Sequence, residues 1–80
     1  MTTEERKMAL KEDAIKKYER LKYDIAAIHL RGEISDDDYR IRRKHIAREE
    51  NLRLAEIDQM SYNKAKYNYE KLMKKNSPGK

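Results

Sequence analysis

Residues 31–39 constrain the fold of this chain more than any other stretch, because they hold the signals that end one helix and begin another. Gly32 is the only glycine before the C-terminal tail, and it can adopt the left-handed backbone conformation that closes a helix without a Cβ clash. Ser35 can accept a hydrogen bond from a free backbone N–H of the next helix, and Asp38 follows at the third position of a capping box. The sequence therefore predicts two helices joined by a turn over residues 32–35.

Further residues of the same stretch support this turn. Ile34 precedes the cap and Tyr39 follows it by four residues, which is the spacing of a hydrophobic staple. The first turn of the second helix carries Asp36, Asp37 and Asp38, whose negative charge suits the positive end of the helix dipole. Because a reversal over about four residues is typical of paired neighbouring helices, we expect an antiparallel helical hairpin.

The composition leaves the choice between a coiled coil and a disordered chain to the periodicity of the sequence. A chain of 80 residues is long enough for at most one small domain. Of these residues 44% are charged and 38% are hydrophobic. Cysteine is absent, and no apolar run is long enough for a signal peptide or a membrane span. We therefore expect a cytoplasmic protein.

The first helix is predicted from about residue 3 to residue 31, because Thr2 and Glu5 have the spacing of a capping box. Apolar residues in this span recur at the three- and four-residue spacing of a coiled coil. This first stripe consists of Leu10, Ala14, Tyr18, Leu21, Ile25 and Ile28. A second stripe, about a third of the way round the helix, consists of Met8, Ile15, Tyr23, Ala26 and Leu30.

The second helix is predicted to run without interruption from about residue 36 to residue 75, since no proline or glycine occurs in that span. At 1.5 Å per residue it forms a rod of about 60 Å. The predicted fold is all-α, a coiled-coil-like hairpin with a long second helix that dimerises into a bundle. Residues 1–76 form the single domain, and residues 77–80 are expected to be a disordered tail.

A break near Asn51 or Ser61 would instead give a three-helix bundle. Neither position has a glycine, a proline or a convincing cap, so the continuous helix is the favoured prediction. The hairpin register pairs Leu10 with Ile57, and it leaves residues 64–75 beyond the end of the first helix. An apolar face on this overhang predicts a partner.

The partner surface is predicted on a second stripe of the long helix. Its members are aromatic or apolar, recur at heptad-like spacing, and belong to residue types that favour protein interfaces. The predicted interface consists of Leu52, Ala55, Tyr62, Tyr67, Tyr69 and Met73. Tyr67 and the nearby lysines form its rim.

Nucleic acid is the alternative partner, because the positive charge is concentrated in the second half of the chain. Of the formal net charge of +5, residues 1–40 contribute −1 and residues 41–80 contribute +6. Lysine and tyrosine together can follow phosphates and stack on unpaired bases. The candidate contacts are Arg42, Arg43, Lys64, Lys66 and Lys71. Protein contact is preferred, because nearby acidic residues can neutralise the arginines.

No residue pattern predicts catalysis, a metal site or a cofactor. The three consecutive aspartates lack the alternating oxygens, the glycine and the final glutamate of a calcium loop, so charge at a helix start is the preferred interpretation. His29 and His45 are isolated and are expected to be surface or rim residues. A phosphate loop and a nucleophile on a strained turn are missing from the sequence. We therefore expect a protein that is not an enzyme.

Residues 23–39, continuing to Arg43-Lys44-His45-Ile46, resemble the short helical module called SHOCT. That family is similar in having an aliphatic helix, a glycine, an Ile-Ser or Ile-Thr pair, two or three acids, an aromatic residue and then a basic helix. The resemblance covers about a third of the chain and implies oligomerisation or interaction without catalytic residues. The small size and the Lys/Tyr/Asn content also resemble small bacteriophage proteins, many of which block a host protein.

These observations together predict a non-enzymatic module for protein–protein interaction or oligomerisation. A homodimer is the first expectation, and a small phage-type regulator or inhibitor of a host protein is a further one. The alternative is a basic helical protein that binds nucleic acid.

Overall fold

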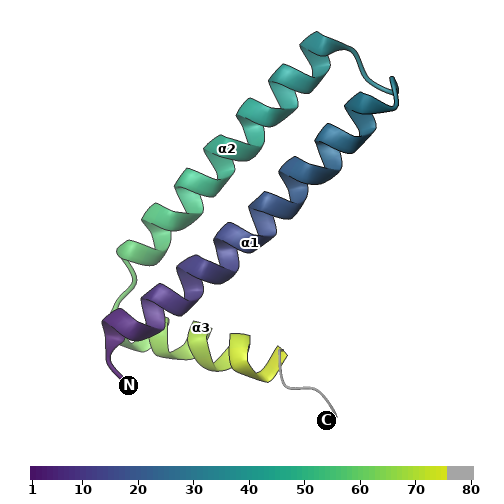
Figure 1. Ribbon diagram of the computed structural model, residues 1–80. Helices are drawn as coiled ribbons and strands as arrows, with labels where there is room; N and C mark the ends of the chain where they lie inside the picture. Colours follow the sequence, from purple (N-terminus) through teal and green to yellow (C-terminus); the bar gives the residue numbers. More distant parts are fainter. Residues whose placement is uncertain (76–80) are drawn as a thin grey trace.

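The computed structural model describes residues 1–75, which form three α-helices and no strand (Figure 1). The helices are α1 (Thr3–Leu30), α2 (Asp36–Asp58) and α3 (Tyr62–Lys75). The predicted all-helical class is confirmed. The tail predicted over residues 77–80 lies outside the described residues. None of the helices within residues 1–75 is long and apolar enough to cross a membrane.

The start and the end of α1 follow the signals read from the sequence. Thr2 and Glu5 form the complete capping box, with the Thr2 N–H donating to Glu5 Oε1 at 2.8 Å and the Glu5 N–H donating to Thr2 Oγ1 at 3.1 Å. At the other end Gly32 has φ +75°, and its N–H donates to the carbonyl of His29. The Glu33 N–H donates to the carbonyl of Ile28, which completes a Schellman motif.

Helix α2 begins where predicted and lies beside α1 (Figure 1). The Ser35 hydroxyl accepts a hydrogen bond from the Asp38 N–H at 3.1 Å, which satisfies one of the free donors of the first turn. Contacts join both ends of the pair. His29 near the end of α1 meets Asp36 at the start of α2, and Lys7 near the start of α1 donates to the carbonyl of Asp58 at the end of α2.

The prediction of one continuous helix over residues 36–75 is wrong. Helix α2 ends at Asp58, and Ser61 caps the start of α3 by accepting from the Lys64 N–H at 3.2 Å. In an unbroken helix the Asp58 carbonyl would accept from the N–H of Tyr62. Here the Asp58 carbonyl accepts from the Lys7 ammonium, and the Ser61 hydroxyl accepts from the Lys64 N–H, so two side chains replace backbone partners at the break.

Burial of apolar side chains explains why the chain folds back at this position. One core cluster joins all three helices and consists of Leu10, Ala14, Ile57, Met60, Ala65 and Leu72. Met60 and Ala65 flank the Ser61 cap at the two positions of a hydrophobic staple, and both are buried. Each large side chain buried this way stabilises the fold by about 1.5–3 kcal/mol, against about 1 kcal/mol for each backbone hydrogen bond lost at the break.

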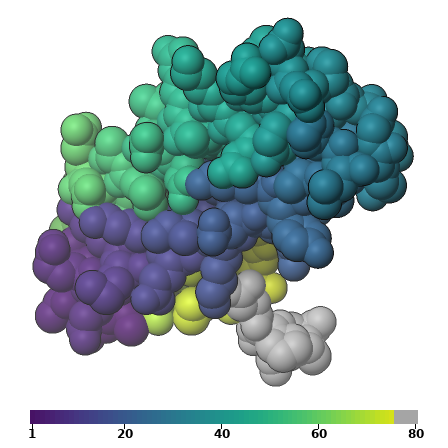
Figure 2. All heavy atoms as spheres, turned by 45° about the horizontal axis from the view of Figure 1, so that its top comes forward, coloured from purple at the N-terminus to yellow at the C-terminus, as the bar shows by residue number. Residues whose placement is uncertain are grey.

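The three helices form a flat layer with α1 in the middle. Helix α1 packs against both α2 and α3, and Figure 2 shows α1 between α2 and the visible part of α3. The Cα atoms extend over 46 × 32 × 13 Å with a radius of gyration of 15.7 Å. A compact domain of this length has a radius of gyration of about 12 Å. Both faces of the layer are therefore open to solvent.

Candidate interaction surfaces

The predicted partner interface does not form one continuous stripe. The break at residues 59–61 separates its two members on α2, Leu52 and Ala55, from the four that lie on α3. A heptad stripe stays on one side only while the helix is unbroken. The structure therefore places the predicted residues on two different surfaces.

On α2, Leu52 and Ala55 share an outward side of the helix with Ile41. Leu52 is 58% exposed and Ile41 is 65% exposed, and Ala55 is exposed as well. Leu52 also borders an open hollow of about 290 Å³, together with Tyr18 and Glu56. Because Ile41, Leu52 and Ala55 are all exposed, this side of α2 remains a candidate interface.

On α3, the tyrosines differ in what they contact. The guanidinium carbon of Arg6 on α1 lies 5.6 Å from the centre of the Tyr62 ring, which is the geometry of a cation–π contact. Tyr69 is half-buried, whereas Tyr67 is 64% exposed and Met73 is exposed. Tyr62 thus helps to attach α3 to α1, while Tyr67 and Met73 are available to a partner.

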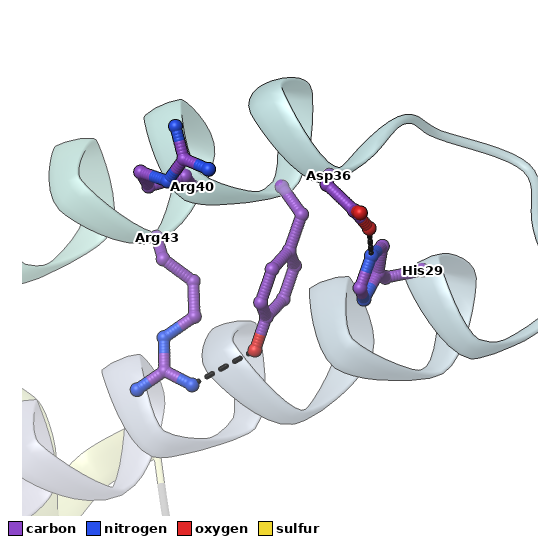
Figure 3. A pocket seen from close by; sticks show the side chains of 5 residues that line it. His29, Asp36, Arg40 and Arg43 are labelled. Atoms are coloured by element: carbon purple, nitrogen blue, oxygen red, sulfur yellow. Dashed lines mark hydrogen bonds and ion pairs between the residues drawn. The ribbon is translucent and has the colours of Figure 1, made fainter.

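The turn end of the α1–α2 pair holds a polar cluster around an open hollow of about 430 Å³. Figure 3 shows His29 of α1 pointing toward Asp36 of α2, with His29 Nε2 2.6 Å from Asp36 Oδ1. The His29 ring stacks on Tyr39 with ring centres 4.3 Å apart and planes 6° from parallel. The Tyr39 hydroxyl accepts from Arg43 at 2.9 Å, and Arg40 completes the lining. These groups satisfy one another across the two helices.

Sequence reasoning missed this cluster. The sequence predicted His29 to be a surface or rim residue, and it predicted Tyr39 to form a staple with Ile34 and to face Ile28 of the first helix. Ile34 and Tyr39 are both half-buried. A histidine three residues before the closing glycine and a tyrosine four residues after the cap lie at facing ends of the two helices, and that spacing is the signal that could have suggested the stack.

The candidate nucleic-acid contacts are also divided between two places. Arg42 and Arg43 lie near the start of α2, where Arg42 pairs with Asp38 at 3.8 Å and Arg43 bonds to Tyr39. Lys64, Lys66 and Lys71 lie on α3 and are exposed. Because the arginines are engaged with side chains of their own helix, the lysines of α3 are the more accessible cations.

One basic hollow of about 230 Å³ lies between the three helices. Helix α2 contributes Arg53, α3 contributes Lys71 and Lys75, and the acidic side chain in the lining is Asp13 of α1. Arg53 forms an ion pair with Glu56, so the lysines carry the unbalanced positive charge of this hollow. Such a hollow can attract an anion.

Three exposed groups have shifted pKa values, and all of them stabilise a helix end. The hydrogen bond from the Thr2 backbone N–H lowers the pKa of Glu5 below its ordinary value. The hydrogen bond and the charge of Arg31 lower the pKa of Glu33, and Glu33 raises the pKa of Arg31 in return. These groups cap and close α1.

Known proteins give no further guidance. Comparison of the chain with protein-family models, with curated proteins and with solved structures gives no match. Residues 1–75 also contain no group of three or more His, Asp or Glu side chains placed to hold a metal ion. The function is therefore inferred from the surfaces alone.

Proposed function

We propose that this protein is a non-enzymatic helical module that works by associating with itself. The observation that carries the proposal is its exposed area. The chain has a mass of 9.7 kDa and exposes 6413 Å². A compact monomer of that mass exposes roughly 5,100 Å², so the surplus is roughly 1,300 Å².

Residues 76–80 can account for slightly more than half of this surplus at most, because five residues of a fully unfolded chain expose about 700 Å². At least roughly 600 Å² of it therefore belongs to residues 1–75. A standard protein interface covers about 800 Å² on each partner, so this remainder is comparable to one small helical contact.

The exposed apolar side chains support the same proposal. Large apolar residues stand outward on every helix of the layer, among them Met8, Ile15 and Leu30 on α1, Ile41 and Leu52 on α2, and Tyr67 and Met73 on α3. Single exposed apolar residues are normal on a monomer, but here they recur along helix faces. Packing of these faces between antiparallel hairpins, in the manner of a coiled coil, would form the predicted bundle.

Light scattering across a concentration series tests this function. Self-association predicts a molar mass that exceeds 9.7 kDa and rises with concentration. A mass that stays at the monomer value at every concentration contradicts the proposal.

Leu52→Glu and Tyr67→Glu are a matched pair for the same measurement, because both side chains are more than half exposed and lie on different helices. We expect Leu52→Glu to lower the mass and Tyr67→Glu to leave it unchanged. If Tyr67→Glu lowers the molar mass and Leu52→Glu does not, the interface lies on α3 and not on α2. The replacement of Tyr62 and Tyr69 by alanine is a poorer test, since it also removes the contact of Tyr62 with Arg6 of α1 and the half-buried ring of Tyr69.

Nucleic-acid binding is the second candidate, supported by the basic hollow where Arg53, Lys71 and Lys75 converge. Binding through these cations predicts a gel shift with single-stranded nucleic acid that weakens steeply as salt is added. Lys71→Glu with Lys75→Glu should abolish the shift, whereas Lys16→Glu on the middle of α1 should not. Absence of a shift at low salt removes this candidate.

A further inference from the structure

Two outward helix faces carry complementary charge. The first, here called the basic seam, lies on α2 and follows the four- and three-residue spacing of a coiled coil; it consists of Ile41, His45, Arg48, Leu52 and Ala55. All five of these residues are exposed. The second, here called the acidic seam, lies on α1 and consists of Met8, Glu12, Ile15, Glu19 and Ala26, with Lys22 at the position between the last two. The first four of these residues are exposed, and Ala26 is half-buried.

The charged members of both seams lack ion-pair partners within the described part of the chain. Glu12, Glu19 and Arg48 form no ion pair with another residue of 1–75, in contrast to seven other pairs that the helices do form. A helix face that mixes apolar residues with unpaired charges of one sign suits a helix with charges of the opposite sign. Each seam has the composition that the other one requires.

We propose that the basic seam of one copy packs antiparallel against the acidic seam of a second copy. This inference rests on the proposed function and names its contact surface. The spacing of the two seams fixes the register. Glu19 follows Ile15 by four residues, and Arg48 precedes Leu52 by four residues. One alignment therefore places Ile15 against Leu52 and Glu19 against Arg48.

The same alignment continues along both helices. Ala26 follows Glu19 by seven residues, and Ile41 precedes Arg48 by seven residues. In the next apolar layer the small side chain of Ala26 therefore lies against the large one of Ile41. Lys22 of the acidic side falls opposite His45, but its ammonium is held by Glu50 of its own chain at 2.8 Å. The contact thus has one ion pair, Glu19 with Arg48, and two apolar layers, Ile15 with Leu52 and Ala26 with Ile41. A polar layer of Lys22 and His45 lies between the ion pair and the second apolar layer, and Glu12 falls opposite Ala55.

A second copy is the occupant that these observations favour over an unrelated protein. The two seams cannot meet within one chain, because α1 and α2 already face each other through other residues, including Leu10 and Ile57. Two matching seams on every copy also provide both halves of the contact.

Charge reversal tests this contact directly. Glu19→Arg places two arginines opposite each other, and Arg48→Glu places two glutamates opposite each other. We expect each variant alone to associate at least about tenfold more weakly than the wild-type chain in light scattering. An equimolar mixture of the two variants restores the Glu–Arg pairing at every contact, so it should recover the wild-type mass.

Asp24→Arg is the matched control. It makes the same charge change on the same helix, about 140° round from Glu19, and it should associate like the wild-type chain. Circular dichroism of each variant checks that the helices are retained, and recovery in the mixture excludes loss of folding as the cause.

The outcomes separate this inference from the proposed function. A wild-type chain that stays at 9.7 kDa overturns both. A wild-type chain that associates, with variants that associate equally well or a mixture that fails to recover, overturns only the contact between the seams.

Discussion

The two ends of the α1–α2 pair are held together by different forces. At the end where α3 folds back, an apolar cluster that includes Leu10, Ile57 and Leu72 excludes water. At the turn end, the His29–Tyr39 stack and its polar neighbours form the contact, and the nearby aliphatic residue Ile28 is only half-buried. The turn is fixed by local backbone signals, whereas the other end depends on residues distant in sequence.

This difference separates the residues that direct the fold from those that stabilise it. Gly32 and Ser35 determine where the chain reverses, but they bury little apolar surface. Ile57 is fully buried and sits beside Met60 at a hinge that has no glycine or proline. We therefore expect substitutions at the α3 end to cost more stability than substitutions at the turn.

The largest effect is expected for Ile57→Ala. Its side chain is 0% exposed, so truncation removes buried contacts and leaves a cavity. Such a change costs about 2–5 kcal/mol, which lowers the Tm of a small domain by at least about 8 °C. Leu30→Ala at the turn end is the control, because Leu30 is 86% exposed and its loss should change stability by no more than about 0.5 kcal/mol. Equal Tm values for the two variants would contradict the difference between the ends.

A smaller effect is expected for Gly32→Ala. The φ of +75° is unfavourable for a residue with a Cβ atom, while no atom lies within 4 Å of the place that a Cβ would occupy. The cost is therefore that of the backbone conformation alone, about 1–2 kcal/mol in urea unfolding. Gly32→Asn should cost less than Gly32→Ala, since asparagine tolerates this conformation better. A larger loss in the asparagine variant would count against a backbone origin.

These contrasts show how much of the fold the sequence could predict. The Thr2 capping box, the closing Gly32 and the Ser35 cap were all predicted, because each depends on residues within a few positions of one another. The break before α3 was not predicted, because the sequence around Ser61 has no glycine or proline to mark it. In the structure Ser61 caps α3, and the neighbouring Met60 is buried. Its stability comes from contacts with α1, which no local pattern encodes.

The interface prediction was limited by the same missed break. The predicted stripe contained Leu52 and Ala55 and continued to Tyr69. In the structure the stripe ends at Asp58, where α2 ends. The sequence did identify outward apolar residues on α2, because the heptad spacing there is uninterrupted. The pairing of His29 with Tyr39 could not be derived from the stripes, since it depends on the approach of two helix ends.

Ser61→Ala and Ser35→Ala compare the two caps directly. Each substitution removes a hydroxyl that accepts a backbone N–H, at a cost of about 1 kcal/mol. Ser35→Ala leaves the turn in place, because Gly32 still closes α1. Ser61→Ala removes the cap at a hinge without such a residue, so it should also speed amide exchange throughout α3. Hydrogen exchange followed by NMR checks this, and equal local effects of the two variants would contradict it.

The smallest effect is expected from acidification, which acts on both ends alike. The folded pKa values of Glu5 and Glu33 lie below the ordinary glutamate value, so the stabilisation from each carboxylate is present above that value, about 4.3, and is lost as the pH falls through the lowered pKa. NMR titration of the two side-chain carboxyl groups should therefore give midpoints below the ordinary value. Thr2→Ala removes the Thr2 side chain, whose hydrogen bond is the second cause of the lowered Glu5 pKa, so it should raise the Glu5 midpoint. The Glu33 midpoint should stay unchanged, because Arg31 still bonds to that carboxylate. An unchanged Glu5 midpoint would show that the Thr2 backbone N–H alone is sufficient to lower its pKa.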